Sequence, residues 1–337
     1  MNQTVNRRIV LASRPVGEPT SENFRLEETA VPQPSEGQVL VRNLYLSLDP
    51  YMRGRMSEGP SYAQPVAIDA VMGGGTVGRV VDSRDPAFSE GDLVLGFGNW
   101  QDYALARGAE LTRLPSGMAR PSWALGVLGM PGFTAWYGLM KIGAPKEGET
   151  VVVAAASGAV GSVVGQIAKL KGCRAVGIAG GPDKCRHIVE DLGFDAAVDY
   201  KRPDWREQLA AATPDGIDVN FENVGGEIME AVMARMNLFS RMPLCGMISG
   251  YNTGDPAMRG DFSPILMRRI EVRGFIVIDF MPKFAEGAMQ LAQWVVEGKL
   301  KHRETIVDGL ENAPVAVNRL FDGGNIGKLV VKVSGTV

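Results

Sequence analysis

The sequence predicts an α/β protein with two domains, a mainly β domain and a doubly wound parallel sheet. Three observations predict this fold. Short apolar runs separated by glycine, proline and aspartate recur through residues 1–120, a pattern typical of a compact barrel or sandwich. From Val151 onward, strand-like and helix-like segments alternate, which favours a parallel sheet covered by helices. The chain of 337 residues is also long enough for two domains.

In the β domain we expect five strands, over residues 24–28, 38–46, 78–82, 92–97 and 101–106. Inside this region, residues 73–78 read Gly-Gly-Gly-Thr-Val-Gly and match the nucleotide pattern GxGxxG literally. No clear strand precedes the match, and the residues that follow, Arg-Val-Val-Asp, favour a strand and not a helix. We therefore interpret this segment as a glycine-rich β-turn or bulge without a nucleotide.

Residues 123–143 are expected to be helical, with Pro131 dividing them into two pieces. The parallel sheet is then predicted from strands over residues 151–155, 174–179, 197–199, 216–222, 241–249 and 271–277. Its helices are predicted over residues 161–170, 183–192, 205–211, 227–236 and 283–297. The remaining segments, 304–308, a helix over 312–321 and a strand over 328–333, are expected to rejoin the N-terminal β domain and make it discontinuous.

The composition excludes several classes of function. A net charge of −3 gives no electrostatic footprint for nucleic acid or an anionic membrane. No apolar run reaches the roughly 18 residues that a membrane span needs, and the first 15 residues lack the apolar region of a signal peptide. We therefore expect a cytoplasmic protein that binds neither nucleic acid nor membrane.

The cysteines and histidines argue against a metal site. The three cysteines are widely spaced and odd in number, which disfavours a disulfide framework. With two histidines, no Cys/His cluster has the spacing of zinc ligands. We expect no metal, so the chemistry must come from an organic cofactor or from acid–base groups.

The turn between the strand at 151 and the helix at 161 is the predicted phosphate site. A strand, a small-residue turn and a helix in this order begin a dinucleotide fold. Ala156 replaces the usual first glycine, Gly158 lets the backbone approach a pyrophosphate, and Gly161 lets the helix pack on the strand. The N–H groups of Val160, Gly161 and Ser162 are expected to face the anion. The alternative is a small-residue turn without a ligand.

The end of the next strand distinguishes between the two nicotinamide cofactors. An NAD site places an acidic side chain there to bind the ribose 2′-hydroxyl. Here Gly180 and Gly181 occupy that place, and Lys184 stands at the head of the following helix. A cation without a carboxylate suits the extra phosphate of NADP. A solvated surface lysine is the alternative, and Asp183 is interpreted as a carboxylate at the helix N-terminus.

Six segments resemble the zinc-independent branch of the medium-chain dehydrogenase/reductase superfamily. This branch includes leukotriene 12-hydroxydehydrogenase/15-oxo-prostaglandin reductases and plant double-bond reductases, and the likeness is greatest to bacterial NADPH-dependent curcumin reductases. The segments are LSLDPYMRGRM (46–56), VLGMPGFTAWYGL (127–139), ASGAVGSVVGQIAKLKGC (156–173), FENVGG (221–226), CGMISGYN (245–252) and GGNIGKLVVKV (323–333). The resemblance implies a GroES-like β domain from residues 1–127 and 301–337, and a Rossmann NADPH-binding domain from residues 128–300.

The resemblance also implies the site residues. Those expected to contact NADP(H) are Gly158, Ala159, Val160, Gly161, Lys184, Tyr200, Asn223, Cys245, Gly246, Ile248, Ser249, Tyr251, Phe275, Ile276, Val277 and Asn325. Those expected to border the substrate are Tyr51, Tyr62 and Tyr251. A homodimer paired through the Rossmann sheet is a further implication.

The activity that the resemblance implies is reduction of the carbon–carbon double bond of an enone. Hydride reaches the β-carbon, negative charge moves to the carbonyl oxygen, and a proton then reaches the α-carbon. Tyrosine hydroxyls suit such an enolate because they donate hydrogen bonds without ionising, so Tyr251 and Tyr51 are the predicted catalytic residues. Two alternatives are a quinone reductase and an NADPH-binding sensor without turnover.

Overall fold

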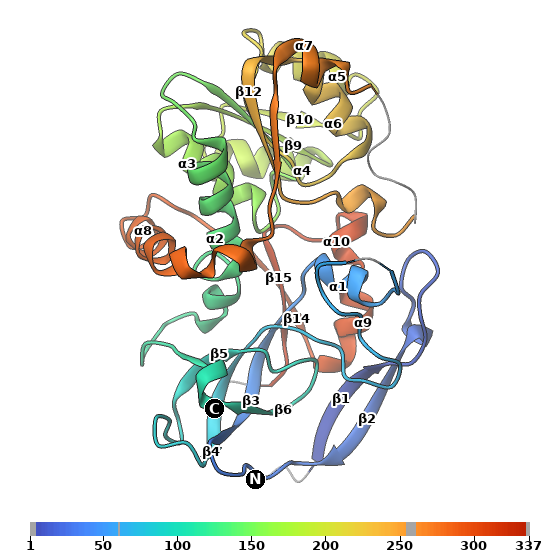
Figure 1. Ribbon diagram of the computed structural model, residues 1–337, viewed down its shortest axis with the longest axis vertical. Helices are drawn as coiled ribbons and strands as arrows, with labels where there is room; N and C mark the ends of the chain where they lie inside the picture. Colours follow the sequence, from blue (N-terminus) through green and yellow to red (C-terminus); the bar gives the residue numbers. More distant parts are fainter. Residues whose placement is uncertain (1–4, 60, 254–260, 335–337) are drawn as a thin grey trace. The chain divides into compact units, whose positions relative to one another are not determined.

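The computed structural model describes residues 5–59, 61–253 and 261–334 and divides the chain into two compact units (Figure 1). The N-terminal unit contains the chain up to Leu125, Glu304–Asn325 and the residues from Leu329 onward. The second unit contains Gly126–Arg303 and Ile326–Lys328. The N-terminal unit is therefore discontinuous in sequence. Within the described residues, no helix has both the length and the apolar character needed to cross a bilayer.

The N-terminal unit is built on a seven-stranded sheet and a two-stranded ribbon. The sheet runs β14-β15-β3-β4-β5-β7, with β6 also paired to β3, and the ribbon is β1-β2. The strands are β1 Val5–Leu11, β2 Phe24–Ala30, β3 Gln38–Ser47, β4 Thr76–Ser83, β5 Leu93–Gly96, β6 Tyr103–Arg107, β7 Thr112–Arg113, β14 Glu304–Asp308 and β15 Lys328–Lys332. The helices are α1 Tyr51–Arg55, α9 Ala313–Ala316 and α10 Arg319–Asp322. All five strands expected between residues 24 and 106 are present.

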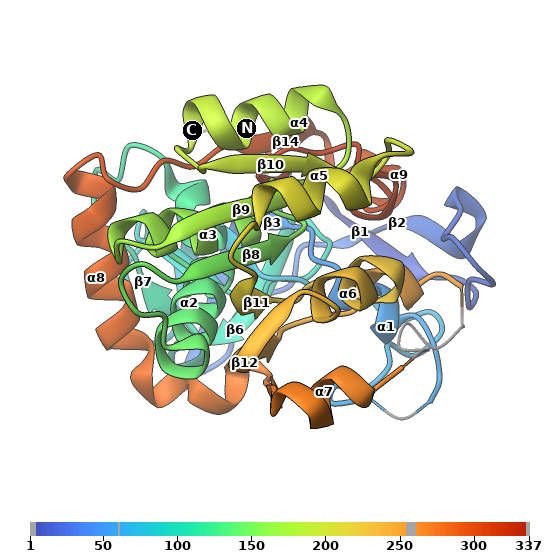
Figure 2. The same ribbon diagram turned by 90° about the horizontal axis from the view of Figure 1, so that it is seen from above.

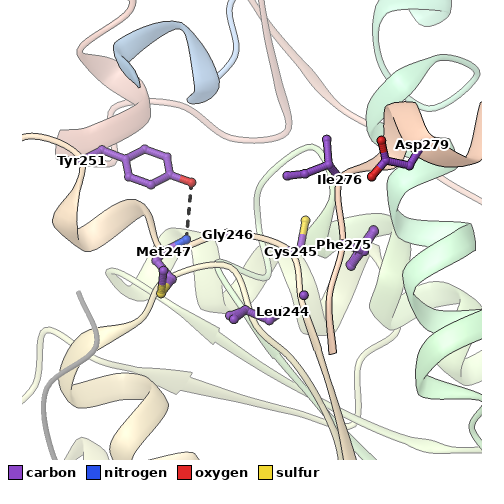
Figure 3. Close-up of a pocket in the computed structure, with 9 residues that line it drawn as sticks. Leu244, Cys245, Gly246, Met247, Tyr251, Phe275, Ile276 and Asp279 are labelled. Carbon is purple, nitrogen blue, oxygen red and sulfur yellow. Dashed lines mark hydrogen bonds between the residues drawn. The ribbon is translucent and has the colours of Figure 1, made fainter. Parts of the chain in front are cut away.

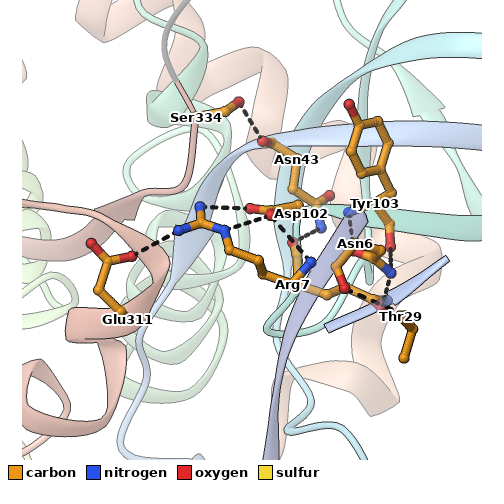
Figure 4. Close-up of polar contacts among 9 residues, drawn as sticks. Asn6, Arg7, Thr29, Asn43, Asp102, Tyr103, Glu311 and Ser334 are labelled. Atoms are coloured by element: carbon orange, nitrogen blue, oxygen red, sulfur yellow. Dashed lines mark hydrogen bonds and ion pairs between the residues drawn. The ribbon is translucent and has the colours of Figure 1, made fainter. Parts of the chain in front are cut away.

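Strand β1 was not predicted, because polar side chains interrupt its apolar pattern. The polar side chains of this strand have charged and polar partners. Arg7 forms two ion pairs, with its Nε 2.8 Å from Asp102 and its Nη1 3.2 Å from Glu311 (Figure 4). Asn6 and Tyr103 form two further hydrogen bonds, of 3.1 and 2.9 Å. Through Glu311, this network ties the returning C-terminal segment to the first strand of the chain.

The glycines at residues 73–78 serve packing in the N-terminal unit. A Cβ on Gly74 would lie 2.8 Å from Leu46 Cδ1, and one on Gly78 would lie 2.6 Å from the Arg42 carbonyl oxygen. Strand β4 begins at Thr76 inside this segment and contains Gly78, and no helix begins there. The predicted β-turn or bulge is confirmed in its structural part, because the pairing of β4 with β3 shifts register between Asn43 and Tyr45, opposite Gly78.

The second unit contains a six-stranded parallel sheet in the order β10-β9-β8-β11-β12-β13. The strands are β8 Thr150–Ala154, β9 Arg174–Ala179, β10 Ala196–Asp199, β11 Ile217–Phe221, β12 Met236–Leu244 and β13 Glu271–Gly274. The helices are α2 Met130–Tyr137, α3 Gly161–Leu170, α4 Pro182–Arg186, α5 Trp205–Ala212, α6 Gly226–Met233, α7 Ser263–Arg268 and α8 Phe284–Val296. Helix α3 covers one face, and α5 and α6 cover the other (Figure 2). The predicted doubly wound parallel sheet is confirmed, and its strand order reverses between β8 and β11, where such sheets bind ligands.

The strands of this sheet are apolar because both faces are covered. Val151, Val152 and Val153 of β8 are fully buried. Met229, Met233 and Met236 were expected to pack in the core because of their helical spacing, and they are at most 3% exposed in one cluster with Val152. Met229 and Met233 belong to α6 and Met236 begins β12, so this cluster joins the helix to the sheet.

Several element boundaries differ from prediction: β13 ends at Gly274 and not at residue 277, and the helix expected over 183–192 is α4 followed by a π-helix at His187–Asp191. Three other differences have an evident physical cause. Pro131 lies in the first turn of α2 and so begins that helix, after a short 3-10 helix at Pro121–Leu125, and does not divide one helix; proline is well tolerated there because the N–H that it lacks has no partner within the helix. The helix expected over 312–321 is broken into α9 and α10 around Asn318, whose side-chain amide donates to the Pro19 carbonyl oxygen at 2.6 Å.

The third difference concerns β12, which spans Met236–Leu244 and not residues 241–249, so α6 ends before Met236. The N–H groups of Cys245 and Gly246 both donate to the Glu222 carbonyl oxygen, at 2.9 and 3.2 Å. These bonds turn the chain out of the sheet after Leu244. A short 3-10 helix at Ile248–Gly250 follows and leads to Tyr251.

Candidate functional site

The turn between β8 and α3 is shaped by close backbone packing. A Cβ on Gly161 would lie 2.4 Å from the Ala155 carbonyl oxygen, so only glycine fits there without a shift. Ala155 is exposed and has a φ of +52°, a left-handed conformation that is strained for alanine. Such strain is concentrated at functional sites. Gly158, Ala159 and Val160 are all partly exposed at this turn, where they were predicted to meet the pyrophosphate.

One detail of the predicted phosphate site is wrong. The Ser162 N–H donates to the Gly158 carbonyl oxygen at 3.0 Å and is therefore used inside the turn. The sequence also gave no sign that Gly327 lies against this turn. Its N–H donates to the Ser157 carbonyl oxygen at 2.7 Å, and it pairs with Gly158 as an isolated parallel bridge. A Cβ on Gly327 would lie 1.9 Å from the Arg303 carbonyl oxygen, so this close approach requires glycine.

The residues predicted to meet the 2′-phosphate of the cofactor lie at and near the end of β9. Tyr200 directly follows β10, is 39% exposed, and has its ring against Gly180, where a Cβ would lie 2.9 Å from ring atoms. Asp199 is the nearby carboxylate, and it accepts hydrogen bonds from the Gly181 and Lys201 N–H groups, at 2.8 and 3.1 Å. Lys184, in α4, is partly exposed. The Asp199 carboxylate therefore already accepts two hydrogen bonds from the backbone.

Asn223 lies where the strand order reverses. It follows β11 by two residues, and its side-chain amide donates to the Ala154 carbonyl oxygen at the end of β8, at 2.8 Å. Its own carbonyl oxygen accepts from the Ile248 N–H at 3.1 Å, and the Ser249 hydroxyl donates to the Val224 carbonyl oxygen at 2.6 Å. Asn223 therefore connects the loops that follow β8, β11 and β12.

A pocket of about 390 Å³ opens beyond the ends of β12 and β13 (Figure 3). Its lining is Leu244, Cys245, Gly246, Met247, Tyr251, Gly274, Phe275, Ile276 and Asp279. The structure thus brings together five of the residues predicted for the nicotinamide side: Cys245, Gly246, Tyr251, Phe275 and Ile276. Ile248, Ser249 and Val277 are near in sequence but are not part of this lining.

Tyr251 has the properties of a neutral hydrogen-bond donor. Burial raises the pKa of its phenol, although the bond from the Met247 N–H opposes this. That N–H lies 3.4 Å from the Tyr251 hydroxyl oxygen, which accepts the bond (Figure 3). Because the oxygen accepts from the backbone, the hydroxyl proton stays available for another acceptor.

The remaining predicted site residues belong to the N-terminal unit. Tyr51 is the first residue of α1, and burial followed by the nearby Asp49 raises the pKa of its phenol, so it is neutral at physiological pH. Tyr62 is 60% exposed. Asn325 lies beyond α10, in the returning segment. Their predicted contacts with substrate or cofactor stay predictions.

Two carboxyl groups at the site were missed from the sequence. Asp279 lines the pocket from the segment after β13, and Glu222, directly after β11, is fully buried. The sequence does contain a signal for Glu222: an acidic residue directly follows the strand-like run Val-Asn-Phe. Asp279 had no local signal, because the pocket joins segments that are distant in sequence.

Comparison with known proteins identifies the family. A model described as "N-terminal domain of oxidoreductase" matches residues 7–114, and one described as "Zinc-binding dehydrogenase" matches residues 159–294. An NADPH-dependent curcumin reductase of Escherichia coli is 55% identical over 98% of this chain and 97% of its own length. The chain belongs to the medium-chain dehydrogenase/reductase family.

Other members of the medium-chain dehydrogenase/reductase family match over nearly the whole chain. A 2-alkenal reductase (NADP⁺-dependent) of Nicotiana tabacum is 40% identical over 98% of both chains. The crystal structure of CurA from Vibrio vulnificus in complex with NADPH has a TM-score of 0.94 and 52% identity, covering 98% of this chain and 100% of that one. Although one family model carries zinc in its name, the described residues contain no group of three or more His, Cys, Asp or Glu side chains that could hold a metal ion.

Proposed function

We propose that this chain is an NADPH-dependent reductase of the carbon–carbon double bond in enones and alkenals. The observation that carries the proposal is the pocket beyond β12 and β13, where a neutral Tyr251 hydroxyl is surrounded by mainly apolar side chains. Such a site suits a conjugated carbonyl compound, which is apolar and needs one donor at its oxygen. The family relatives include an NADPH-dependent curcumin reductase and a 2-alkenal reductase.

The residues of the second unit fit NADPH. Gly161 allows α3 to begin against the turn, with its N-terminus toward the place of a pyrophosphate. The Tyr200 ring lies against Gly180, and the Asp199 carboxylate already accepts hydrogen bonds from two N–H groups. We propose that Lys184 pairs with the 2′-phosphate, and that Gly158–Gly161, Tyr200, Asn223 and the residues after β12 and β13 hold the rest of the cofactor.

When bound, the cofactor supplies the hydride. Tyr251 is proposed to donate a hydrogen bond to the carbonyl oxygen of the substrate, where negative charge develops as the β-carbon is reduced. The raised pKa keeps this phenol protonated, so the donor is present throughout the ordinary pH range. Phe275 and Ile276 contribute apolar side chains to the pocket lining, and a hydrogen bond is stronger in apolar surroundings than in water. Tyr51 is proposed to border the substrate from the N-terminal unit.

Loss of NADPH absorbance with a panel of substrates tests this function. The panel contains enones and alkenals, with the matched saturated ketones, simple alcohols and quinones. Turnover of enones and alkenals, with the saturated carbonyl compound as product, is the expected result. Turnover of quinones alone would favour a quinone reductase. NADPH binding without oxidation by any compound would favour a non-catalytic sensor.

We also propose a cytoplasmic homodimer, with a β-barrel domain formed by residues 1–127 and 301–337 and a cofactor domain formed by residues 128–300. Strand β13 is an edge of the six-stranded sheet, and an unpaired edge can accept a strand from another molecule. Large apolar side chains on β12 and α7 are exposed: Leu238, Phe239, Leu266 and Met267. Exposed apolar patches of this kind mark interaction surfaces.

A further inference from the structure

Glu222 is a buried acidic side chain to which the proposed chemistry gives no role. It follows β11 directly and has no exposed surface. Its Oε1 accepts the N–H groups of Val224 and Gly225 at 2.6 and 2.9 Å, and its Oε2 lies 3.0 Å from Asn220 Nδ2. Among the described residues, no lysine, arginine or histidine forms an ion pair with it. Three neutral partners therefore hold this carboxyl group.

The main chain of Glu222 carries the segment that forms the pocket. Its carbonyl oxygen accepts from Cys245 and Gly246, and its N–H donates to the Pro243 carbonyl oxygen at 3.0 Å. The two residues after Glu222 continue the pattern, because Asn223 and Val224 accept the N–H groups of Ile248 and Ser249. The carboxyl group thus fixes a tight loop, and the loop supports the segment that ends at Tyr251.

The surroundings of Glu222 favour an uncharged carboxyl group. Burial raises its pKa above the ordinary 4.5, although the backbone and Asn220 hydrogen bonds oppose this. The titratable group that faces it is the Cys245 thiol, and burial raises the pKa of that thiol to about 12, so it is uncharged as well. Asn220 Oδ1 is buried without a hydrogen-bond partner. With the Asn220 amide turned around, a protonated carboxyl could donate to this oxygen.

We propose that Glu222 is a positioning residue, whose uncharged carboxyl group holds loop 223–226 and thereby sets the place of Tyr251 in the pocket. The inference rests on the proposed function only for the role of Tyr251. In this form of the side chain, one carboxyl oxygen accepts hydrogen bonds from the Val224 and Gly225 N–H groups, and the other donates its proton to Asn220. Glutamine can reproduce all three bonds, whereas alanine reproduces none.

The test compares Glu222→Gln and Glu222→Ala, with Glu227→Gln in the exposed first turn of α6 as the matched control. In Glu222→Ala we expect kcat to fall by about tenfold to a hundredfold, because a small misplacement of a catalytic group has effects of this size. The KM for NADPH should change less. Glu222→Gln and the control should keep kcat within about twofold, since small losses are the rule where hydrogen bonds are preserved. An equal loss in both Glu222 variants would overturn the proposal.

Hydrogen exchange and the pH dependence of stability test the role of Glu222 without relying on the proposed enzymatic activity. Hydrogen exchange of the holoenzyme should show residues 245–251 less protected in Glu222→Ala and unchanged in Glu222→Gln, whatever the substrate is. Unchanged protection in a folded Glu222→Ala would contradict the positioning role. If Glu222→Ala fails to fold, Glu222→Gln decides, because wild-type exchange and turnover in that variant support the uncharged form and a loss of either refutes it.

The pH dependence of stability tests the uncharged form directly. A folded-state pKa above the unfolded-state value gives stability that is fully present below the unfolded-state pKa and is lost as the pH rises through the folded-state pKa. Wild type should therefore lose stability relative to Glu222→Gln as the pH rises above about 4.5. Unfolding temperatures measured over a pH series provide the comparison. Parallel curves for the two proteins would show that this carboxyl group is charged when folded.

Discussion

At the scale of single residues, Tyr251 is the side chain on which the proposed chemistry depends most. Replacing it by phenylalanine removes the hydroxyl and keeps the ring that lines the pocket. We expect kcat with an enone to fall by about a hundredfold, as when one donor to a developing oxyanion is lost. NADPH affinity should change little. Steady-state kinetics and NADPH titration measure the two effects.

Tyr45→Phe is the control for this variant, because Tyr45 packs against a core cluster of the N-terminal unit. Its kinetics should match those of wild type. Unchanged turnover in Tyr251→Phe would instead assign the hydrogen bond to Tyr51 or to water. The raised pKa of Tyr251 also predicts that the phenol causes no loss of activity near its ordinary value of 10.0, since it ionises only at higher pH.

Lys184 is the residue that we propose distinguishes NADPH from NADH. In Lys184→Ala, we expect KM for NADPH to rise by about tenfold to a hundredfold, because a charge-assisted hydrogen bond contributes about 1.5–3 kcal/mol. KM for NADH should stay nearly constant, since NADH lacks the 2′-phosphate. Arg186→Ala removes a more exposed cation from the same helix, which pairs with Asp183 at 3.2 Å, and serves as the control. Equal losses for both cofactors would contradict the phosphate role.

The residues that could be predicted from the sequence are those whose role follows from a local pattern. The turn at Gly158–Gly161 was predicted because a strand, glycines and a helix are adjacent in the chain. Glu222 and Asp279 were not, because the burial of one and the pocket lining of the other depend on neighbours after β12 and β13. The contacts proposed for Tyr51, Tyr62 and Asn325 stay predictions for the same reason.

At the scale of elements, strand β12 shows that the pattern of apolar residues does not predict where a strand ends. The apolar residues after Leu244 predicted a strand up to residue 249, and an isolated sequence offers no reason to stop earlier. The strand ends because two successive N–H groups bind the Glu222 carbonyl oxygen. The residues that follow this ending, Cys245, Gly246 and Met247, line the pocket.

We expect the two glycine-rich segments, at residues 73–78 and 156–161, to differ in function, and substitution of one glycine in each tests this. Alanine at Gly161 would place a Cβ 2.4 Å from the Ala155 carbonyl oxygen, and alanine at Gly78 would place one 2.6 Å from that of Arg42. Overpacking of this kind destabilises a fold by about 1–3 kcal/mol. Both variants should therefore unfold at lower temperature than wild type.

NADPH titration of the two folded variants gives the distinction. Gly161→Ala moves the start of α3 and should weaken NADPH binding by about tenfold or more, since its N–H groups no longer converge on the anion. Gly78→Ala should leave the affinity unchanged, because Gly78 begins no helix. Weaker NADPH binding in Gly78→Ala would revive the literal GxGxxG match as a nucleotide site.

At the scale of the whole molecule, the alternation of strands and helices predicted the six-stranded sheet, because each βα unit is short and local. The β1 ribbon was not predicted, because Asn6, Arg7 and Arg8 break the apolar alternation. Their polar groups are satisfied by partners such as Asp102 and Glu27, which are distant in the chain. Long-range pairing of this kind leaves little trace in a sequence window.

The exposed edge of the six-stranded sheet supports the proposed homodimer. With β13 as the edge, two sheets could join, and the exposed side chains on β12 and α7 would be covered. We expect sedimentation to give twice the chain mass of 36.2 kDa.

A double variant, Phe239→Glu with Leu266→Glu, should give the monomer, because burying two unpaired carboxylates in an interface is strongly unfavourable. Val315→Glu, at an equally exposed apolar position of the N-terminal unit, should remain dimeric. A dimer that persists in the double variant would place the interface elsewhere, and a monomeric wild type would contradict the proposal itself.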